Sequence, residues 1–102
     1  MAAETLVRGD WNGEICNLRF KTHRRTAWIE AFERYYEGRV TRNTIQDALQ
    51  LVIENPVKKH LTVNLYLTGT VMLQGARPVL TTFENQTFDE LRGMIEQTAQ
   101  QI

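Results

Sequence analysis

Alternating polar side chains in the middle of the chain are the residues best suited to bind a ligand. Residues 61–75 read LTVNLYLTGTVMLQG, and every second position on each side of Thr68 and Gly69 carries an amide, hydroxyl, aromatic or thioether group. These residues are Thr62, Asn64, Tyr66, Thr70, Met72 and Gln74. Amides that form paired hydrogen bonds, a ring that can stack and a soft thioether suit contacts with nucleic-acid bases or with a partner protein.

Polar and basic residues near the N-terminus add candidates of the same kind. Residues 14–21, EICNLRFK, alternate between apolar and polar side chains, which predicts a half-buried strand. Residues 19–25, RFKTHRR, form a positive cluster that is typical of a solvated strand end and loop but could also contact phosphates. The candidate nucleic-acid-binding residues are Asn17, Arg19, Lys21, Arg24, Arg25, Asn64, Tyr66, Met72 and Gln74.

Residues that commonly carry out catalysis or bind metals lack a suitable spacing. His23 and His60 are the only histidines, each lies beside basic residues, and neither is spaced like a metal ligand or a member of a catalytic triad. The carboxylates of residues 30–37 are interleaved with Arg34, which is typical of a solvated helix face. We expect no enzymatic activity, no cofactor, no metal site and no small-molecule substrate.

Composition limits the location and the partners of the chain. Twelve basic and twelve acidic residues give a net charge of zero, so binding to nucleic acid would have to come from a local patch. The single Cys16 cannot form an internal disulfide or a zinc knuckle. The sequence shows neither a transmembrane run nor a signal peptide. These features predict an intracellular protein, cytoplasmic or nuclear, that has no membrane partner.

Helical periodicity predicts three helices that would support these residues. Apolar side chains recur at helical spacing in residues 26–38, 41–56 and 87–102. The first two helices would end at Gly38 and Pro56. The third would begin with Thr87 as its N-cap and Glu90 completing a capping box.

Strands are predicted at residues 14–21 and on both sides of the Gly69 turn, with a further short strand from Val79 to Phe83. A two-residue turn would place the apolar side chains of the central hairpin on opposite faces. A three-residue loop, residues 67–69, brings them to one face and puts Gly69 where a left-handed conformation is required. The expected pairs are Leu65 with Val71 and Val63 with Leu73.

These elements predict a single α+β domain over residues 1–102, either a whole protein or a module of a larger one. We expect two layers, an antiparallel sheet of about three to five strands with the helices packed on one face. The other sheet face would be uncovered. It would carry the polar residues described above and would contain no acid except at its edge.

The hairpin NLYLTGTVMLQG, residues 64–75, resembles the TATA-box-binding-protein-like domain at the N-terminus of bacterial ribonuclease HIII. In that family a tyrosine, a small-residue–glycine turn, an apolar pair and a final Gln-Gly recur in this order. Similar hairpins occur in uncharacterised proteins of animal mobile elements.

The resemblance implies a TBP-like fold whose curved sheet holds nucleic acid, while in the ribonucleases a separate domain cuts it. It implies nucleic-acid contacts by Tyr66, Met72 and Gln74, with Gly69 and Gly75 as conformational positions. This sequence departs from the family at Thr70, where a basic residue is usual, and it lacks the catalytic domain.

Two functions remain open at this point. The first is a non-catalytic module that binds DNA or RNA, single- or double-stranded, through the exposed sheet face. The second is a protein-interaction or self-association module, such as a homodimer, that uses the same face or a sheet edge. Neutral net charge favours the second function, whereas the composition of the face and the hairpin resemblance favour the first.

Overall fold

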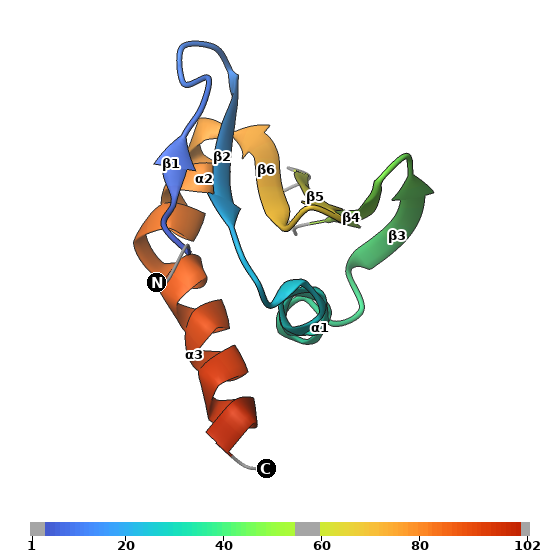
Figure 1. Ribbon diagram of the computed structural model, residues 1–102. Helices are drawn as coiled ribbons and strands as arrows, with labels where there is room; N and C mark the ends of the chain where they lie inside the picture. The colour runs from blue at the N-terminus through green and yellow to red at the C-terminus, as the bar shows by residue number, and fades with distance from the viewer. Residues whose placement is uncertain (1–3, 55–59, 101–102) are drawn as a thin grey trace.

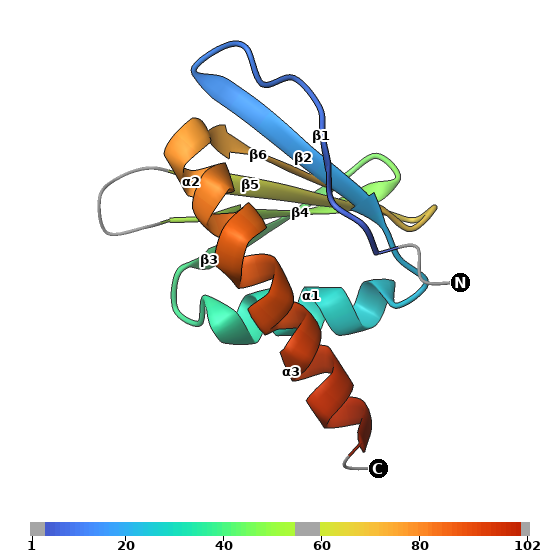
Figure 2. The same cartoon turned by 90° about the vertical axis from the view of Figure 1, so that its left-hand side faces the viewer.

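Helices cover one face of a six-stranded antiparallel sheet in the computed structural model of the chain, which describes residues 4–54 and 60–100 (Figures 1 and 2). The strands are β1 (Val7–Arg8), β2 (Ile15–Lys21), β3 (Val40–Ile45), β4 (Ala48–Ile53), β5 (Leu61–Tyr66) and β6 (Thr70–Ala76). The helices are α1 (Arg25–Tyr35), α2 (Arg77–Thr82) and α3 (Phe88–Gln100), and a π-helical turn, η1 (Phe83–Thr87), joins α2 to α3. The lateral strand order is β1-β2-β6-β5-β4-β3.

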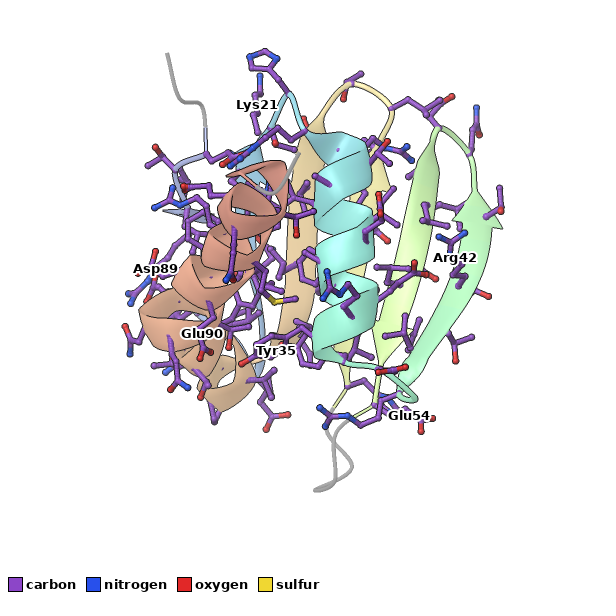
Figure 3. All side chains as sticks on the ribbon, turned by 90° about the horizontal axis from the view of Figure 1, so that it is seen from below. Lys21, Tyr35, Arg42, Glu54, Asp89 and Glu90 are labelled. Carbon is purple, nitrogen blue, oxygen red and sulfur yellow. The ribbon has the colours of Figure 1, made fainter. Side chains whose placement is uncertain are left out.

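The α+β class and the helix layer on one face are confirmed, although the sheet has six strands where about three to five were expected. Seen from the helix side, α3 lies over the β2 side of the sheet and α1 over its middle (Figure 3). No helix within residues 4–54 and 60–100 combines the length and hydropathy that are needed to cross a membrane.

The strand predicted at residues 14–21 forms as β2, and the central hairpin has the predicted geometry. Leu65 pairs with Val71 and Val63 with Leu73, so the loop contains three residues. Gly69 has a φ of 98°, and a Cβ there would lie 2.6 Å from the carbonyl oxygen of Thr22. Glycine is therefore required both by the backbone conformation and by the close approach of the backbone that follows β2.

The helix predicted for residues 41–56 is wrong, because the described part of this segment belongs to the β3–β4 hairpin. Leu49, Leu51 and Ile53 alternate along β4 and face the helix layer, where Leu51 and Ile53 are buried. The segment is also rich in β-branched residues, which pack well on a pleated surface. Asp47 has a φ of 61°, which allows the tight turn. The predicted stop at Pro56 lies outside the described residues.

The strand predicted from Val79 to Phe83 is also wrong, because these residues continue from α2 into η1. Pro78 lies in the first turn of α2, where a missing backbone N–H leaves no intrahelical bond unmade. Leu80 and Phe83 are buried against the core. The apolar residues of this segment therefore recur with a helical period, and Pro78 marks the start of a helix.

The third predicted helix exists, but its predicted capping box does not form. Thr87 is the last residue of η1 and is continuous with α3, so it is not an N-cap. Glu90 instead accepts a hydrogen bond of 2.7 Å from the hydroxyl of Tyr35 and links α3 to α1. Phe88, Leu91 and Ile95 form the predicted apolar stripe. Ala99 and Ile102, its two other predicted members, lie outside the side chains that the structure describes.

Aromatic rings join the sheet to the helices in the core. The ring of Trp28 lies 4.7 Å from that of Phe20 on β2 and 5.5 Å from that of Phe88 on α3, nearly parallel to the latter. Phe32 stacks on Phe83 with a centroid distance of 6.0 Å. These contacts fix α1, η1 and α3 on one sheet face. No helix in the described part of the chain lies over the opposite face, here named the outer face (Figure 2).

Candidate nucleic-acid interface

Strand register determines which side chains share the outer face. Residues paired across antiparallel strands point to the same side of the sheet. The rows that follow from the pairing are Lys21 with Thr70; Arg19 with Val7, Met72, Asn64, Gln50 and Asn43; Asn17 with Gln74, Thr62, Val52 and Thr41; and Ile15 with Ala76. Tyr66 lies beside Ala48 at the loop end of the face. Within the described strands, no residue on this face is acidic.

Seven of the nine predicted site residues lie on the outer face. They are Asn17, Arg19, Lys21, Asn64, Tyr66, Met72 and Gln74. Arg19, Lys21 and Gln74 are exposed, whereas Tyr66 and Met72 are half-buried. The exposed cations lie on β2, the Met72 thioether lies beside them on β6, and the Tyr66 ring lies one strand further toward the sheet centre, on β5. The face can therefore offer positive charge and a contact surface together.

Three carboxamides cross the far half of the outer face as a hydrogen-bonded row, here named the amide ladder. The Nδ2 of Asn43 donates to Oε1 of Gln50 at 3.4 Å, and the Nε2 of Gln50 donates to Oδ1 of Asn64 at 3.1 Å. Asn64 is only 8% exposed. Its amide therefore stiffens the face more than it offers a contact to a ligand.

Gln50 and Asn43 were missed in the sequence because their segment was predicted as a helix. The alternation of Leu49, Leu51 and Ile53 was the available signal, since in a strand it places Gln50 on the opposite side. Asn43 then follows as the residue paired with Gln50 across the turn.

Asn17 has a structural task besides its place on the outer face. Its Oδ1 accepts a hydrogen bond of 3.1 Å from the backbone N–H of Asp10, and its backbone bonds to Gly9 and Asp10. A Cβ on Gly9 would lie 1.7 Å from this oxygen. The side chain therefore fixes the connection between β1 and β2, and its oxygen is already engaged.

Arg24 and Arg25 do not join the outer face, because the chain turns toward the helix layer after β2. The Arg24 guanidinium donates to both carboxylate oxygens of Glu4, at 3.0 and 2.5 Å. Arg25 donates to the carbonyl oxygen of Leu65, at 3.2 Å from Nε and 3.0 Å from Nη2. Both guanidinium groups thus hold parts of the fold together, and we do not carry them into the proposed interface.

Glu4 is the centre of a buried polar cluster at the N-terminal end of α1. Besides Arg24, its carboxylate accepts hydrogen bonds from Thr22 Oγ1 at 2.6 Å and from Trp28 Nε1 at 3.0 Å. Burial alone would raise the pKa of Glu4, but the hydrogen bonds from Arg24, Thr22 and Trp28 and the charge of Arg24 together lower this pKa to about 2. The cluster is a stabilising contact between the N-terminal segment and α1.

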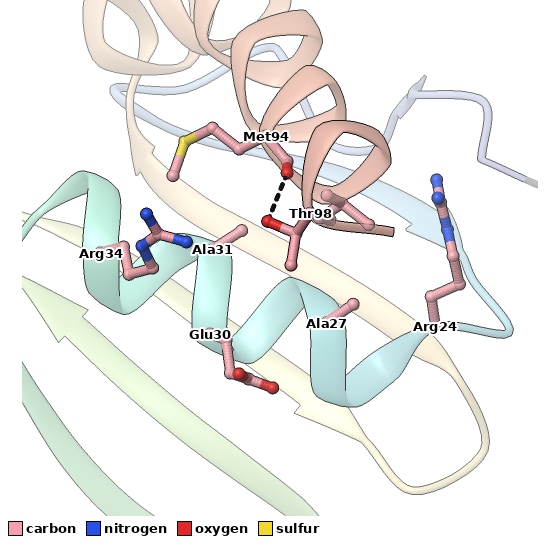
Figure 4. Close-up of a pocket in the computed structure, with 8 residues that line it drawn as sticks. Arg24, Ala27, Glu30, Ala31, Arg34, Met94 and Thr98 are labelled. Carbon is pink, nitrogen blue, oxygen red and sulfur yellow. Dashed lines mark hydrogen bonds between the residues drawn. The ribbon is translucent and has the colours of Figure 1, made fainter. Parts of the chain in front are cut away.

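A groove lies between α1 and α3 (Figure 4). Its volume is about 280 Å³, slightly below the range of about 300–1,000 Å³ that is typical of small-molecule sites. Its apolar lining comes from Ala27, Ala31, Met94 and Ile95. The hydroxyl of Thr98 donates to the carbonyl of Met94 at 3.0 Å, within its own helix. In residues 4–54 and 60–100, no three His, Cys, Asp or Glu side chains are grouped to hold a metal.

Comparisons of the chain with known protein families, with curated proteins and with solved structures each found no match.

Proposed function

We propose that the outer face binds nucleic acid and that the domain does so without catalysis. The observation that carries this proposal is the composition of one sheet face, whose described strands present no carboxylate. On this face the exposed cations Arg19 and Lys21 lie on β2, Met72 is paired with Arg19, and Tyr66 lies one strand further, on β5. A local patch of this kind can attract phosphates even though the net charge of the chain is zero.

Each group on the face has a distinct task in this proposal. Arg19 and Lys21 are two residues apart on β2, so their Cα atoms are separated by about 7 Å along the strand, and both side chains can contact one phosphate backbone. Tyr66 and Met72 provide a ring and a thioether on which bases can pack. Gln74 is exposed and can form hydrogen bonds with base edges.

The resemblance of the hairpin to the TBP-like domain of ribonuclease HIII supports the same reading. In that family the sheet surface, and not the helix layer, holds nucleic acid. Here the matching residues Tyr66, Met72 and Gln74 point to the uncovered side of the sheet. Both lines of support concern the same face, so they lead to one experiment.

An interaction with a protein through the outer face is the second candidate. Neutral net charge and half-buried apolar residues such as Met72 and Val52 favour it. Ionic strength separates the two candidates, because phosphate contacts weaken steeply with salt and apolar interfaces do not.

The test is fluorescence anisotropy with single- and double-stranded DNA and RNA oligonucleotides over a series of salt concentrations. If Arg19 and Lys21 each neutralise a phosphate, Arg19→Ala or Lys21→Ala should lower the slope of log K against log salt by about one unit. Tyr66→Ala should weaken binding by about 1–3 kcal/mol with little change in slope, because stacking releases no counterion.

Arg34→Ala is the matched control, since it removes an exposed cation on the helix side of the molecule. It should leave affinity and slope nearly unchanged. Absence of binding at low salt, or an equal loss of slope in the Arg34 variant, would refute the proposal.

A further inference from the structure

β3 leaves one edge of the sheet open. It is the last strand in the lateral order, and no element within residues 4–54 and 60–100 pairs with its outer side. The opposite edge is formed by β1, which has only two residues. β3 has six residues and contains no proline, lysine or acid. Sheets usually protect such an edge by shortening it, charging it or covering it. The one charged residue of β3 is Arg42, and its guanidinium is bound to Glu33 of α1, so it does not block the edge.

The backbone of β3 presents hydrogen-bonding groups to this edge at alternate residues. In an antiparallel pair, one residue bonds to the neighbouring strand and the next points its N–H and C=O away from it. The bond of 3.0 Å from the N–H of Glu54 to the carbonyl of Arg39 fixes the alternation, so the odd-numbered residues face β4. Val40, Arg42 and Thr44 therefore direct their N–H and C=O groups to the open side.

We propose that this edge pairs with β3 of a second copy of the chain, in antiparallel orientation, with Asn43 on the two-fold axis. Residues that face each other across an antiparallel pair lie on the same side of the sheet. The two-fold axis therefore has to pass midway between one residue and the same residue of the partner subunit. An axis at Arg42 would oppose two guanidinium groups. An axis at Asn43 pairs Arg42 with Thr44 of the partner subunit and Thr41 with Ile45 of the partner subunit, and it opposes no like charges.

The amide ladder supports the same register. Asn43 is its end member at the open edge, and its backbone groups face β4. In the proposed pairing, Asn43 and its copy form a non-hydrogen-bonded pair with Cα atoms about 4.5 Å apart, where side chains approach most closely. Two carboxamides can then donate to and accept from each other, and the ladder of one subunit continues into that of the other.

The Arg42 side chain leaves the edge accessible. It binds the carboxylate of Glu33 on α1 through both Nε and Nη2, the latter at 3.0 Å, and is thus held on the helix side of β3 (Figure 3). An edge of six residues is a small contact compared with standard interfaces. The dimer is therefore of the weak class, and its population depends on concentration.

Sedimentation equilibrium of the full chain tests this inference. The mass of the wild type should rise from 11.9 kDa toward twice that value as concentration increases. Asn43→Asp and Asn43→Lys should each remain monomeric, because like charges meet on the axis. An equal mixture of the two variants should dimerise again, since the opposed charges now attract.

Thr41→Asp and Thr41→Lys are the matched controls, because residue 41 lies on the same strand and face but opposes Ile45 of the partner subunit. Mixing these two variants should produce no gain in mass. Circular dichroism establishes that every variant is folded, and hydrogen exchange gives a second reading. The amides of Arg42 and Thr44 should become protected as concentration rises.

Three results would each overturn the inference: a wild type that stays at 11.9 kDa throughout, Asn43 variants that dimerise like the wild type, or a mixture that gains no mass. The inference does not depend on nucleic-acid binding. Neither Arg19 nor Lys21 takes part in the edge, so their alanine variants should dimerise normally.

Discussion

Glu4 shows how one side chain can connect the N-terminal segment to the helix layer. Its carboxylate receives hydrogen bonds from Thr22, Arg24 and Trp28, and its backbone carbonyl accepts a further bond of 3.0 Å from Arg92 on α3. No sequence pattern singled out this residue, because its partners are distributed over the connection between β2 and α1, α1 itself and α3. The contact exists only once the fold has formed.

Replacing Glu4 by Gln should destabilise the protein by about 2 kcal/mol at neutral pH, since it removes a charge-assisted, mostly buried cluster. The pKa of Glu4 is lowered from 4.5 to about 2 on folding, so its stabilising effect is present above pH 4.5 and is lost as pH falls toward about 2. Urea unfolding of both proteins over this range is the measurement. Parallel pH profiles for wild type and variant would contradict this role.

The two faces of the central hairpin should differ in their tolerance of mutation. Leu65 and Val71 are fully buried, so Leu65→Asn and Val71→Asn should each cost more than about 1–3 kcal/mol, the cost of an unpaired amide alone. Gln74→Ala should stay within about 0.5 kcal/mol.

Asn64→Ala should fall between these limits, at about 1 kcal/mol, because it leaves Gln50 without its acceptor. The sequence analysis placed Asn64 on the uncovered face without this hydrogen bond, because Gln50 was assigned to a helix. If thermal melts show that Gln74→Ala destabilises the protein more than Leu65→Asn does, the two faces of the hairpin are interchanged.

The sequence predicted the elements whose own residue pattern determines their structure. It did not predict the elements whose structure is decided by contacts with residues that are distant in the sequence. The alternation in β2 and the three-residue loop at Gly69 follow from a single face having to be apolar. The β3–β4 segment has apolar residues that satisfy both a helical and a strand period, and the pairing of β4 with β5 decides between them. The segment at Val79 was misread for a similar reason, because a short apolar run after a proline suits either a strand or a helix start.

Substitutions at Asp47 test whether this segment forms the β3–β4 hairpin and not the predicted helix. Because Asp47 has a φ of 61°, Asp47→Gly should be neutral or slightly stabilising, whereas Asp47→Val should cost about 1–3 kcal/mol. A helix would give the opposite order, since glycine is less favourable than aspartate in a helix and valine is about equal to it. Denaturant midpoints of the two variants are sufficient to decide.

The molecule as a whole combines zero net charge with an uneven distribution of side chains. The described carboxylates lie on the helix side, at strand ends or in loops, while the outer face keeps Arg19 and Lys21. Much of this face was foreseeable, because strand alternation alone placed seven of the nine residues together. Two features could be recognised only from the tertiary structure. These are the contribution of β3 and β4 to the face, and the position of Arg24 and Arg25 on the helix side.

Two methionines offer the most direct test of the claim that the outer face is the binding surface. Met72 lies on the outer face, and Met94 lines the groove between α1 and α3 on the other side of the molecule. In a titration of methyl-labelled protein with an oligonucleotide at low salt, the account predicts that the Met72 methyl resonance shifts and saturates while that of Met94 stays in place. A shift confined to Met94, or no shift of Met72 at a concentration that saturates anisotropy, would contradict the account.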